Sequence, residues 1–243
     1  MSKDRLISSH AIERLPSGEA PQRHTLDGRL VTLEPLDTEK HAQELYAASH
    51  ETAEARQIWT YLPDGPFADA SAFTAWIDAM ANNPDRVLFA FRDHASGRAA
   101  GMANYLDIRP THGAVEIGYI WFAPFLQRTP QSTEALFLML RYAFDTLRYR
   151  RVEWRCNALN EKSRAAALRL GFTFEGIFYQ HMVVKGHNRD TAWYSILDGE
   201  WPRLRGHFEA WLAPANFDAQ GRQRQSLREL NRDGRRRSDE PNA

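Results

Sequence analysis

The sequence predicts a mixed α+β domain with a central, twisted, mostly antiparallel sheet of about seven strands flanked by helices. Three observations support this class. Short apolar segments between residues 87 and 122 are separated only by turns, as in an antiparallel meander. A long helical pattern then runs from Ser132 to Leu147, with apolar residues at helical spacing. The segment Arg151–Cys156 alternates as a strand, and the helix before it is long enough for the crossover that parallel strands need.

The other elements follow from periodicity and from capping residues. Asp37 and Asn160 are expected to begin helices, and Gly171 is expected to end one. The predicted strands cover residues 26–36, 87–92, 99–109, 114–122, 151–156, 172–184 and 190–197. The predicted helices cover residues 38–48, 161–170 and 200–213, together with one that begins at Asp69 or Ser71 and ends before Asn82, and one that begins at Gln131 or Ser132 and runs to Leu147.

Composition divides the chain into one domain and two ends. Residues 25–213 carry all the periodic segments and form the predicted domain. Residues 1–24 are polar and without sustained period, which predicts a flexible arm. Residues 214–243 are rich in Arg and poor in apolar residues, which predicts a disordered tail.

Charge and cysteine content exclude several classes of protein. The formal net charge of the 243 residues is +0, so there is no global electrostatic case for binding nucleic acid or an anionic membrane. The single cysteine, Cys156, excludes an internal disulfide framework and a cysteine-based metal cluster, and we expect no metal site. No apolar run matches a membrane span or a signal peptide, so we expect a cytoplasmic protein.

The segment from Val115 to Leu147 predicts an anion site. It reads as a strand, a short loop containing Gln127, Arg128 and Thr129, and the long helix. Free N–H groups and the positive end of the helix dipole point back at that loop. Such a helix start is well suited to a phosphate.

Three local segments resemble the GNAT superfamily of acyl-CoA-dependent N-acyltransferases, and its ribosomal-protein-alanine (Rim-type) branch in particular. VEIGYIW (residues 115–121) is similar to the fourth strand of that branch. QRTPQSTEA (127–135) lies where the family has its pyrophosphate loop, Q/R-x-x-G-x-G/A. NEKSRAAALRLGFTFEGIF (160–178) resembles the N-x-x-S…LGF-x-x-EG segment. The resemblance implies a GNAT-like fold, acetyl-CoA or another acyl-CoA as donor, and an amine acceptor.

The loop departs from the family pattern at two positions. Pro130 and Ser132 replace the small residues, and Pro130 has no N–H to donate. One expected phosphate contact is therefore missing or supplied by another group. Side chains of Arg128, Thr129 and Ser132 are candidates to compensate.

The resemblance implies roles for two catalytic candidates. Glu116, set in an apolar strand, is the candidate general base, since desolvation there would raise its pKa toward neutrality. The alternative is that Glu116 faces solvent or pairs with an arginine across the sheet. Ser163 is the candidate to protonate or hydrogen-bond the leaving thiolate, although a serine in a first helical turn is also an ordinary structural residue.

The resemblance also implies the cofactor contacts. The two strands on either side of the crossover helix should splay, so that backbone groups of one of them pair with the pantetheine arm. Asn160 is expected both to cap a helix and to contact that arm. The predicted cofactor-binding residues are Ile120, Trp121, Phe122, Gln127, Arg128, Thr129, Gln131, Ser132, Thr133, Asn160 and Ser163.

The acceptor contacts rest on segments that line the acceptor cleft in such folds. The predicted substrate-binding residues are Trp59, Tyr61, Tyr105, Tyr179 and His181, against the alternative that most are core residues. The Asn188-Arg189-Asp190 segment is either a hairpin ion pair or a cleft rim, with the structural interpretation favoured. Cys156 is interpreted as a packing residue, because direct transfer needs no such nucleophile.

The sequence therefore predicts an acyl-CoA-dependent N-acyltransferase that passes the acyl group, most simply acetyl, directly to a primary amine of a protein N-terminus or small molecule. The alternative is a non-catalytic acyl-CoA sensor or a ribosome-associated binding module on the same fold. Its sequence support is Pro130 in the loop and the basic tail. Whether the chain forms a homodimer stays open.

Overall fold

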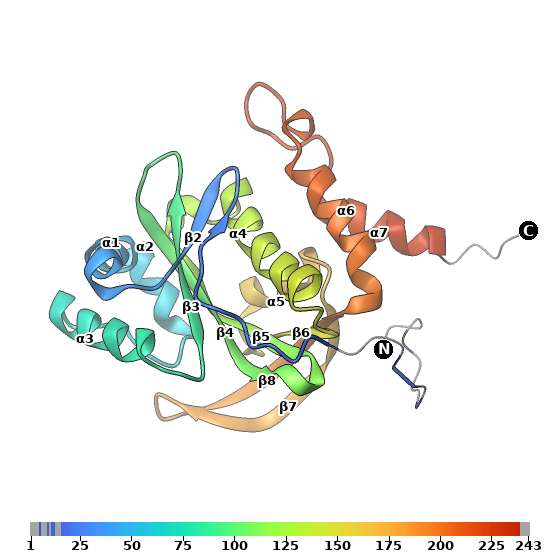
Figure 1. Ribbon diagram of the computed structural model, residues 1–243. Coiled ribbons are helices and arrows are strands. Elements are labelled where there is room, and N and C mark those ends of the chain that lie inside the picture. Colours follow the sequence, from blue (N-terminus) through green and yellow to red (C-terminus); the bar gives the residue numbers. More distant parts are fainter. Residues whose placement is uncertain (1–4, 6–8, 10, 13–15, 239–243) are drawn as a thin grey trace, which may run out of the picture.

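The computed structural model describes residues 5, 9, 11–12 and 16–238, and its centre is one eight-stranded sheet (Figure 1). The strand order is β1-β2-β3-β4-β5-β6-β8-β7. The strands are β1 (Leu26–Asp27), β2 (Val31–Pro35), β3 (Val87–Asp93), β4 (Ala99–Arg109), β5 (Ala114–Phe122), β6 (Arg151–Asn157), β7 (Thr173–Val184) and β8 (His187–Leu197). Only β5 and β6 pair in parallel. The predicted first strand is divided by the turn at Gly28 into β1 and β2, which explains the eighth strand.

Helices cover both faces of the sheet. The α-helices are α1 (Thr38–His50), α2 (Ala53–Arg56), α3 (Ala70–Ala81), α4 (Pro130–Arg141), α5 (Glu161–Arg169), α6 (Trp201–Leu212) and α7 (Leu227–Ser238). Helices α1 and α3 pack on Leu88, Ala90 and Met102 of the sheet. Helix α4 packs on the opposite face, together with α5 and α6. The crossover through α4 makes β5 and β6 parallel, as the sequence predicted.

The capping residues position the helices. Asp37 and Asn160 accept backbone N–H bonds from Lys40 and Ser163, so both predicted caps are confirmed. Helix α4 begins at Pro130, earlier than predicted, because Thr129 caps it. Proline suits this first helical position, where its missing N–H would have no partner in the helix. Beyond Arg141 the chain continues as a π-helical turn, Tyr142–Thr146.

The C-terminal segment corrects the prediction of a disordered tail. Helix α7 packs against α6, and its first residue, Leu227, is fully buried. The Asn231 side chain donates to the backbone oxygen of Arg169 on α5 at 2.9 Å. A few apolar contacts and a buried amide thus order a segment whose average composition is polar. Residues 239–243 lie outside the described residues.

The chain before β1 runs along the α4 side of the sheet. The Ser17 N–H donates to the Leu147 carbonyl, and the Tyr149 hydroxyl donates to the Glu19 carbonyl. The flexibility predicted for residues 1–24 stays a prediction, because residues 1–4, 6–8, 10 and 13–15 lie outside the described part of the chain.

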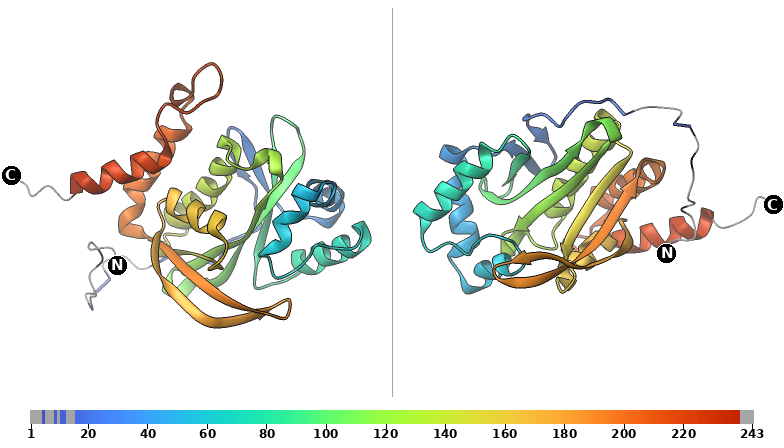
Figure 2. Two further views of the ribbon diagram at one scale, coloured as in Figure 1. Left: turned by 180° about the vertical axis from the view of Figure 1, so that it is seen from behind. Right: turned by 90° about the horizontal axis from the view of Figure 1, so that it is seen from below.

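The β7–β8 hairpin reaches from the edge of the sheet back toward the α1–α3 layer, as the view from below shows (Figure 2). Near its tip, the Lys185 ammonium donates to the backbone oxygen of Trp59 at 2.8 Å. Trp59 belongs to a 3-10 turn, η1 (Gln57–Thr60), that follows α2. This contact ties the far end of the hairpin to the opposite side of the molecule.

Candidate active site

The parallel strands β5 and β6 separate partway along their length. Their pairing ends with Glu116 opposite Glu153, although β5 continues to Phe122 and β6 to Asn157. Beyond Glu116 the backbone of β5 pairs only with β4, on its other side. The splay that the resemblance implied is therefore present, and it opens directly after the candidate base.

A bulge in β5 lies at this separation. Met102 pairs with Trp121, and Asn104 pairs with Gly118. The distance between these two pairs is therefore three residues along β5 but only two residues along β4. The extra residue falls at Tyr119, whose φ of 53° is in the left-handed region. The Tyr119 hydroxyl donates to Asp64 at 2.8 Å. The bulge turns the end of β5 away from β6 and gives the strands room to diverge.

Glu116 is buried beside a cation at the mouth of the gap. Glu116 is only 5% exposed to solvent. The Arg155 Nε donates to Glu116 Oε2 at 2.5 Å, and the same guanidinium also contacts Asp107. Burial raises the pKa of Glu116 to about 7, although Arg155 acts in the opposite direction. A carboxyl group with this pKa can take up and release a proton near neutral pH.

Alternation along the strands gathers one set of side chains around Glu116. Trp193 and Thr191 of β8 pair with Arg155 and Asn157 of β6, so they point to the same side of the sheet. The Arg155 guanidinium lies 4.6 Å from the centre of the Trp193 ring. We call the set Glu116, Arg155, Arg189, Thr191 and Trp193 the Glu116 face. The expected pairing of Glu116 with an arginine and the high pKa of Glu116 occur together.

Ser163 lies on the other side of the sheet, beside the same strands. Its hydroxyl accepts the Trp154 indole N–H at 3.0 Å, and its backbone N–H donates to Asn160. Trp154 and Cys156 alternate with Arg155 along β6, which separates them from the Glu116 face. The gap between β5 and β6 therefore has Glu116 on one side and Ser163 on the other. Cys156 is buried, and burial raises the pKa of its thiol.

The predicted phosphate loop is compact and capped by its own side chains. The Thr129 hydroxyl accepts the Ser132 N–H at 3.3 Å, and the Thr133 N–H donates to the Thr129 carbonyl. Gln127 is exposed, and its side chain donates to the Phe122 carbonyl at 3.0 Å. Arg128 is exposed and has a φ of 63°, so the left-handed residue of this loop is an arginine. Because Pro130 is the first helical residue, its missing N–H does not distort the helix start.

A second arginine lies at the start of α4. Arg169 of α5 donates to the Thr133 hydroxyl at 3.1 Å, and its guanidinium lies 4.7 Å from the centre of the Trp211 ring. Burial lowers the pKa of Arg169. The start of α4 therefore has positive charge from Arg128 and Arg169 as well as from the helix dipole.

Two of the predicted substrate contacts are wrong. Trp59 is fully buried among aromatic rings of the α1–α3 layer, and its indole N–H donates to the Ser49 carbonyl. Tyr105 is fully buried on the α4 side of the sheet, where its hydroxyl donates to the Met139 carbonyl at 2.5 Å. Both side chains are core residues, because an aromatic ring with a satisfied polar atom gains more from burial than from exposure.

The other three predicted substrate contacts, Tyr61, Tyr179 and His181, lie at the surface. Tyr61 is partly exposed after η1, and Tyr179 on β7 is 75% exposed. His181 is exposed, and its Nδ1 forms a hydrogen bond of 3.0 Å with the Thr191 hydroxyl. His181 thus contacts the Glu116 face directly, while contacts of Tyr61 and Tyr179 with a substrate stay predictions.

Sequence reasoning missed Arg155 and Trp193, and it favoured a structural role for Arg189. Each sits in an alternating strand that gives no local signal of chemistry. Only the pairing of β6 with both β5 and β8 brings these side chains next to Glu116. The charge alternation in RVEWRC was the available signal, since an arginine inside a central strand needs a partner.

Membrane-spanning helices and metal-binding clusters are both absent from the described residues. No helix there is both long enough and apolar enough to cross a membrane. Nor does that part of the chain bring together three or more His, Cys, Asp or Glu residues in an arrangement that could hold a metal ion.

Comparison with known proteins agrees with the resemblance. The model of the acetyltransferase (GNAT) domain matches residues 30–173. A crystal structure of a GCN5-related N-acetyltransferase from Brucella melitensis is 47% identical, with a TM-score of 0.86, and the match covers 90% of this chain and 99% of that one. A probable acetyltransferase of the GNAT family from Chromobacterium violaceum is 39% identical, with a TM-score of 0.74, over 83% of this chain and 100% of that one.

The chain therefore belongs to the GNAT acetyltransferase family, whose acyl donor is acetyl-CoA. A curated relative, named "Putative ribosomal N-acetyltransferase YdaF" from Bacillus subtilis, is 34% identical over 105 residues. That match covers 43% of this chain and 57% of the relative's length. The predicted family and its mixed fold are confirmed.

Proposed function

We propose that this protein transfers an acetyl group from acetyl-CoA directly to an amine. The observation that carries the proposal is the separation of β5 from β6 immediately after Glu116. A thioester lying in this gap would have the buried carboxyl group on one side and the Ser163 hydroxyl on the other. Direct transfer needs this arrangement, because the attacking amine and the leaving thiolate occupy opposite ends of the reacting centre.

The donor binds along the loop and β5 in this proposal. The positive end of the α4 dipole, with the exposed Arg128 nearby, binds the pyrophosphate. The backbone of Ile120, Trp121 and Phe122, which is not paired with β6, is available to the pantetheine amides. Asn160 caps α5 at the other side of the gap and faces the same arm.

Glu116 acts as the general base. With a pKa of about 7 it is substantially deprotonated at neutral pH and can take the amine proton, directly or through a water molecule. The amine nitrogen then attacks the thioester carbonyl carbon, the C–S bond breaks, and the thiolate of CoA receives a proton. In this proposal the Ser163 hydroxyl, which accepts a hydrogen bond from Trp154, donates its own proton to the sulfur.

Two measurements test the proposal. Calorimetry with acetyl-CoA should detect binding, and no binding at high micromolar concentration would contradict the donor site. Release of free CoA thiol should then depend on an added amine, across a panel of amines and peptides. A non-catalytic sensor would bind acetyl-CoA and release no thiol with any amine.

A further inference from the structure

Arg189 is a cation without a counterion near the candidate base. Among the residues that the structure describes, no carboxylate lies within ion-pair distance of its guanidinium. Its Nε is buried and has no hydrogen-bond partner there. The sequence allowed a hairpin ion pair, but Asp190 instead accepts the Gln180 N–H and the Asn188 amide. Arg189 therefore does not form the hairpin ion pair with Asp190.

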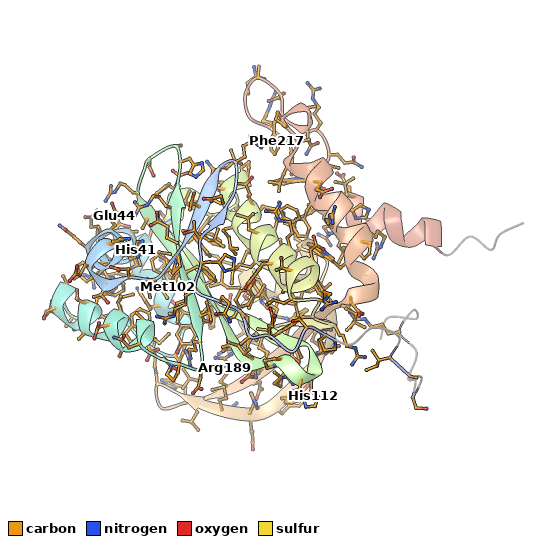
Figure 3. All side chains as sticks on the ribbon, viewed as in Figure 1. His41, Glu44, Met102, His112, Arg189 and Phe217 are labelled. Carbon is orange, nitrogen blue, oxygen red and sulfur yellow. The ribbon has the colours of Figure 1, made fainter. Side chains whose placement is uncertain are left out.

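The other arginine of the Glu116 face is already neutralised. Arg155 contacts both Glu116 and Asp107, which together offset its charge. Arg189 lies on β8 two residues before Thr191 and four before Trp193, so alternation turns it toward the same side of the sheet. Figure 3 labels Arg189 between the central strands and the β7–β8 hairpin. Of the two arginines on the Glu116 face, only Arg155 therefore contacts carboxylates among the described residues.

The hairpin that carries Arg189 is anchored at its far end. Lys185 donates to the Trp59 carbonyl, and Arg189 pairs with Met182 between that anchor and the body of the sheet. Burial lowers the pKa of Arg189, and Glu116 is the strongest opposing influence on that pKa. Its position is set by structure on both sides.

An unpaired buried donor is costly. Leaving it without a partner costs about 1–3 kcal/mol, so such groups persist where a ligand completes them. The guanidinium is a planar fork that matches the oxygens of a carboxylate or a phosphate. We propose that the acceptor is an amine that also carries an anionic group, a carboxylate or a phosphate, and that Arg189 binds this group while the amine faces Glu116. This inference rests on the proposed function, and it makes Arg189 a specificity-determining residue.

The test uses matched amines that differ only in the anionic group. The pairs are β-alanine and β-alaninamide, phosphoethanolamine and ethanolamine, and peptides beginning with Glu or Gln and otherwise identical. Thiol release with acetyl-CoA is measured for each. We expect kcat/KM for the anionic member to exceed that of the neutral member by about tenfold or more in at least one pair, because a site built for a charged group rejects a ligand that lacks it. The pair of amines that shows this preference tells whether the site recognises a carboxylate or a phosphate.

Variants assign the preference to Arg189. Arg189→Met should bring both members of the favoured pair to a similar kcat/KM, mainly by raising KM for the anionic member. Arg189→Lys keeps the positive charge but loses the planar guanidinium, so it should retain part of the preference for the anionic amine. The matched control is Arg98→Met, an exposed arginine on the β3–β4 turn, which should keep all of it. Calorimetry with acetyl-CoA on each variant checks that the donor site is intact.

Several results would overturn the inference. Equal or faster reaction of the neutral members would do so, as would a preference that survives Arg189→Met. If no pair reacts, the anionic members are titrated into CoA-saturated protein, in which the phosphate site is occupied; absence of binding again rejects the inference. These outcomes differ from failure of the proposed function, in which the protein neither binds acetyl-CoA nor releases thiol with any amine.

Discussion

The two sides of the candidate site are built in different ways. The donor side comes from two short stretches of chain, residues 127–133 and 160–163, and its polar groups bond mainly within those stretches. The Glu116 face takes its side chains from β5, β6 and β8, which are brought together only by strand pairing. Its central ion pair joins Glu116 and Arg155, which are 39 positions apart in the sequence.

Because the two sides are built differently, different interactions stabilise their polar and charged groups. A capped helix start is stabilised by hydrogen bonds within a few residues of the cap, so much of the donor side depends on near neighbours in the chain. A buried carboxyl group has to be stabilised by whatever the fold places beside it. Burial and Arg155 oppose each other at Glu116, and the balance leaves its pKa at about 7. The donor side is therefore expected to govern affinity for CoA, and the Glu116 face the rate and its pH dependence.

The largest expected effect is that of Glu116→Gln. Loss of the base should lower kcat by about 10²–10⁴-fold, while the Kd for acetyl-CoA stays unchanged. In the wild type, kcat/KM should rise as the pH increases through about 7, because Glu116 loses its proton there. We call this rise the limb of the pH profile, and the variant should lack it. Stopped assays of thiol release over a pH series measure both effects. The matched control is Glu153→Gln, a buried carboxyl group on the next strand, paired with Arg151, which should retain the limb.

The next effect is on stability, at the C-terminal segment that packs on the donor side. Leu227→Ala should lower the free energy of unfolding by about 2–3 kcal/mol, because it removes a fully buried side chain. Urea denaturation followed by tryptophan fluorescence measures this loss. Arg228→Ala, on the exposed side of the same helix, is the control. Equal stability of the two variants would mean that α7 is not part of the folded domain.

A smaller effect is expected for Arg155→Met. Removing the cation should raise the pKa of Glu116 further, since a nearby positive charge favours the carboxylate. The rise of kcat/KM with pH should move to higher pH by about one unit, so activity near pH 7 falls about fivefold and recovers at alkaline pH. Arg155→Lys should move the limb less. If the pH at which kcat/KM rises is unchanged in both variants, Arg155 has no influence on the pKa of the base.

The smallest effect is expected on the donor side itself. Arg128→Glu should raise the Kd for acetyl-CoA by about fivefold at low salt, and less at high salt, since Arg128 is exposed and its field is screened. The pH dependence of kcat should not change. Calorimetry at two ionic strengths, with Arg98→Glu as the control, checks this. If Arg128→Glu changed kcat but not the Kd for acetyl-CoA, the division of the site into a donor side and the Glu116 face would be contradicted.

Much of this molecule could be predicted from local patterns. Alternation predicted the meander and the later strands, and the caps at Asp37 and Asn160 predicted two helix starts. The helix crossover predicted the parallel pair β5–β6. Glu116 was recognised because a carboxyl group in an apolar strand is costly without a function or a partner. All of these signals lie within a few residues along the chain.

The errors came from properties that depend on distant neighbours. Trp59 and Tyr105 looked like cleft residues, but their burial is decided by the helices packed over them. The tail looked disordered because its composition is polar, yet Leu227 and Asn231 find partners on α5 and α6. Composition averages over a segment, whereas packing depends on a few particular contacts.

The sequence by itself determined the order of the main strands and helices up to α6, the helix starts at Asp37 and Asn160, and the place of Glu116 in an apolar strand, because these depend on hydrogen bonds and periodicities between near neighbours in the chain. Only the tertiary structure decided where β5 leaves β6, which arginine balances Glu116, and which arginine is left without a counterion. Those outcomes depend on the pairing of β5, β6 and β8 and on the desolvation that the whole fold imposes.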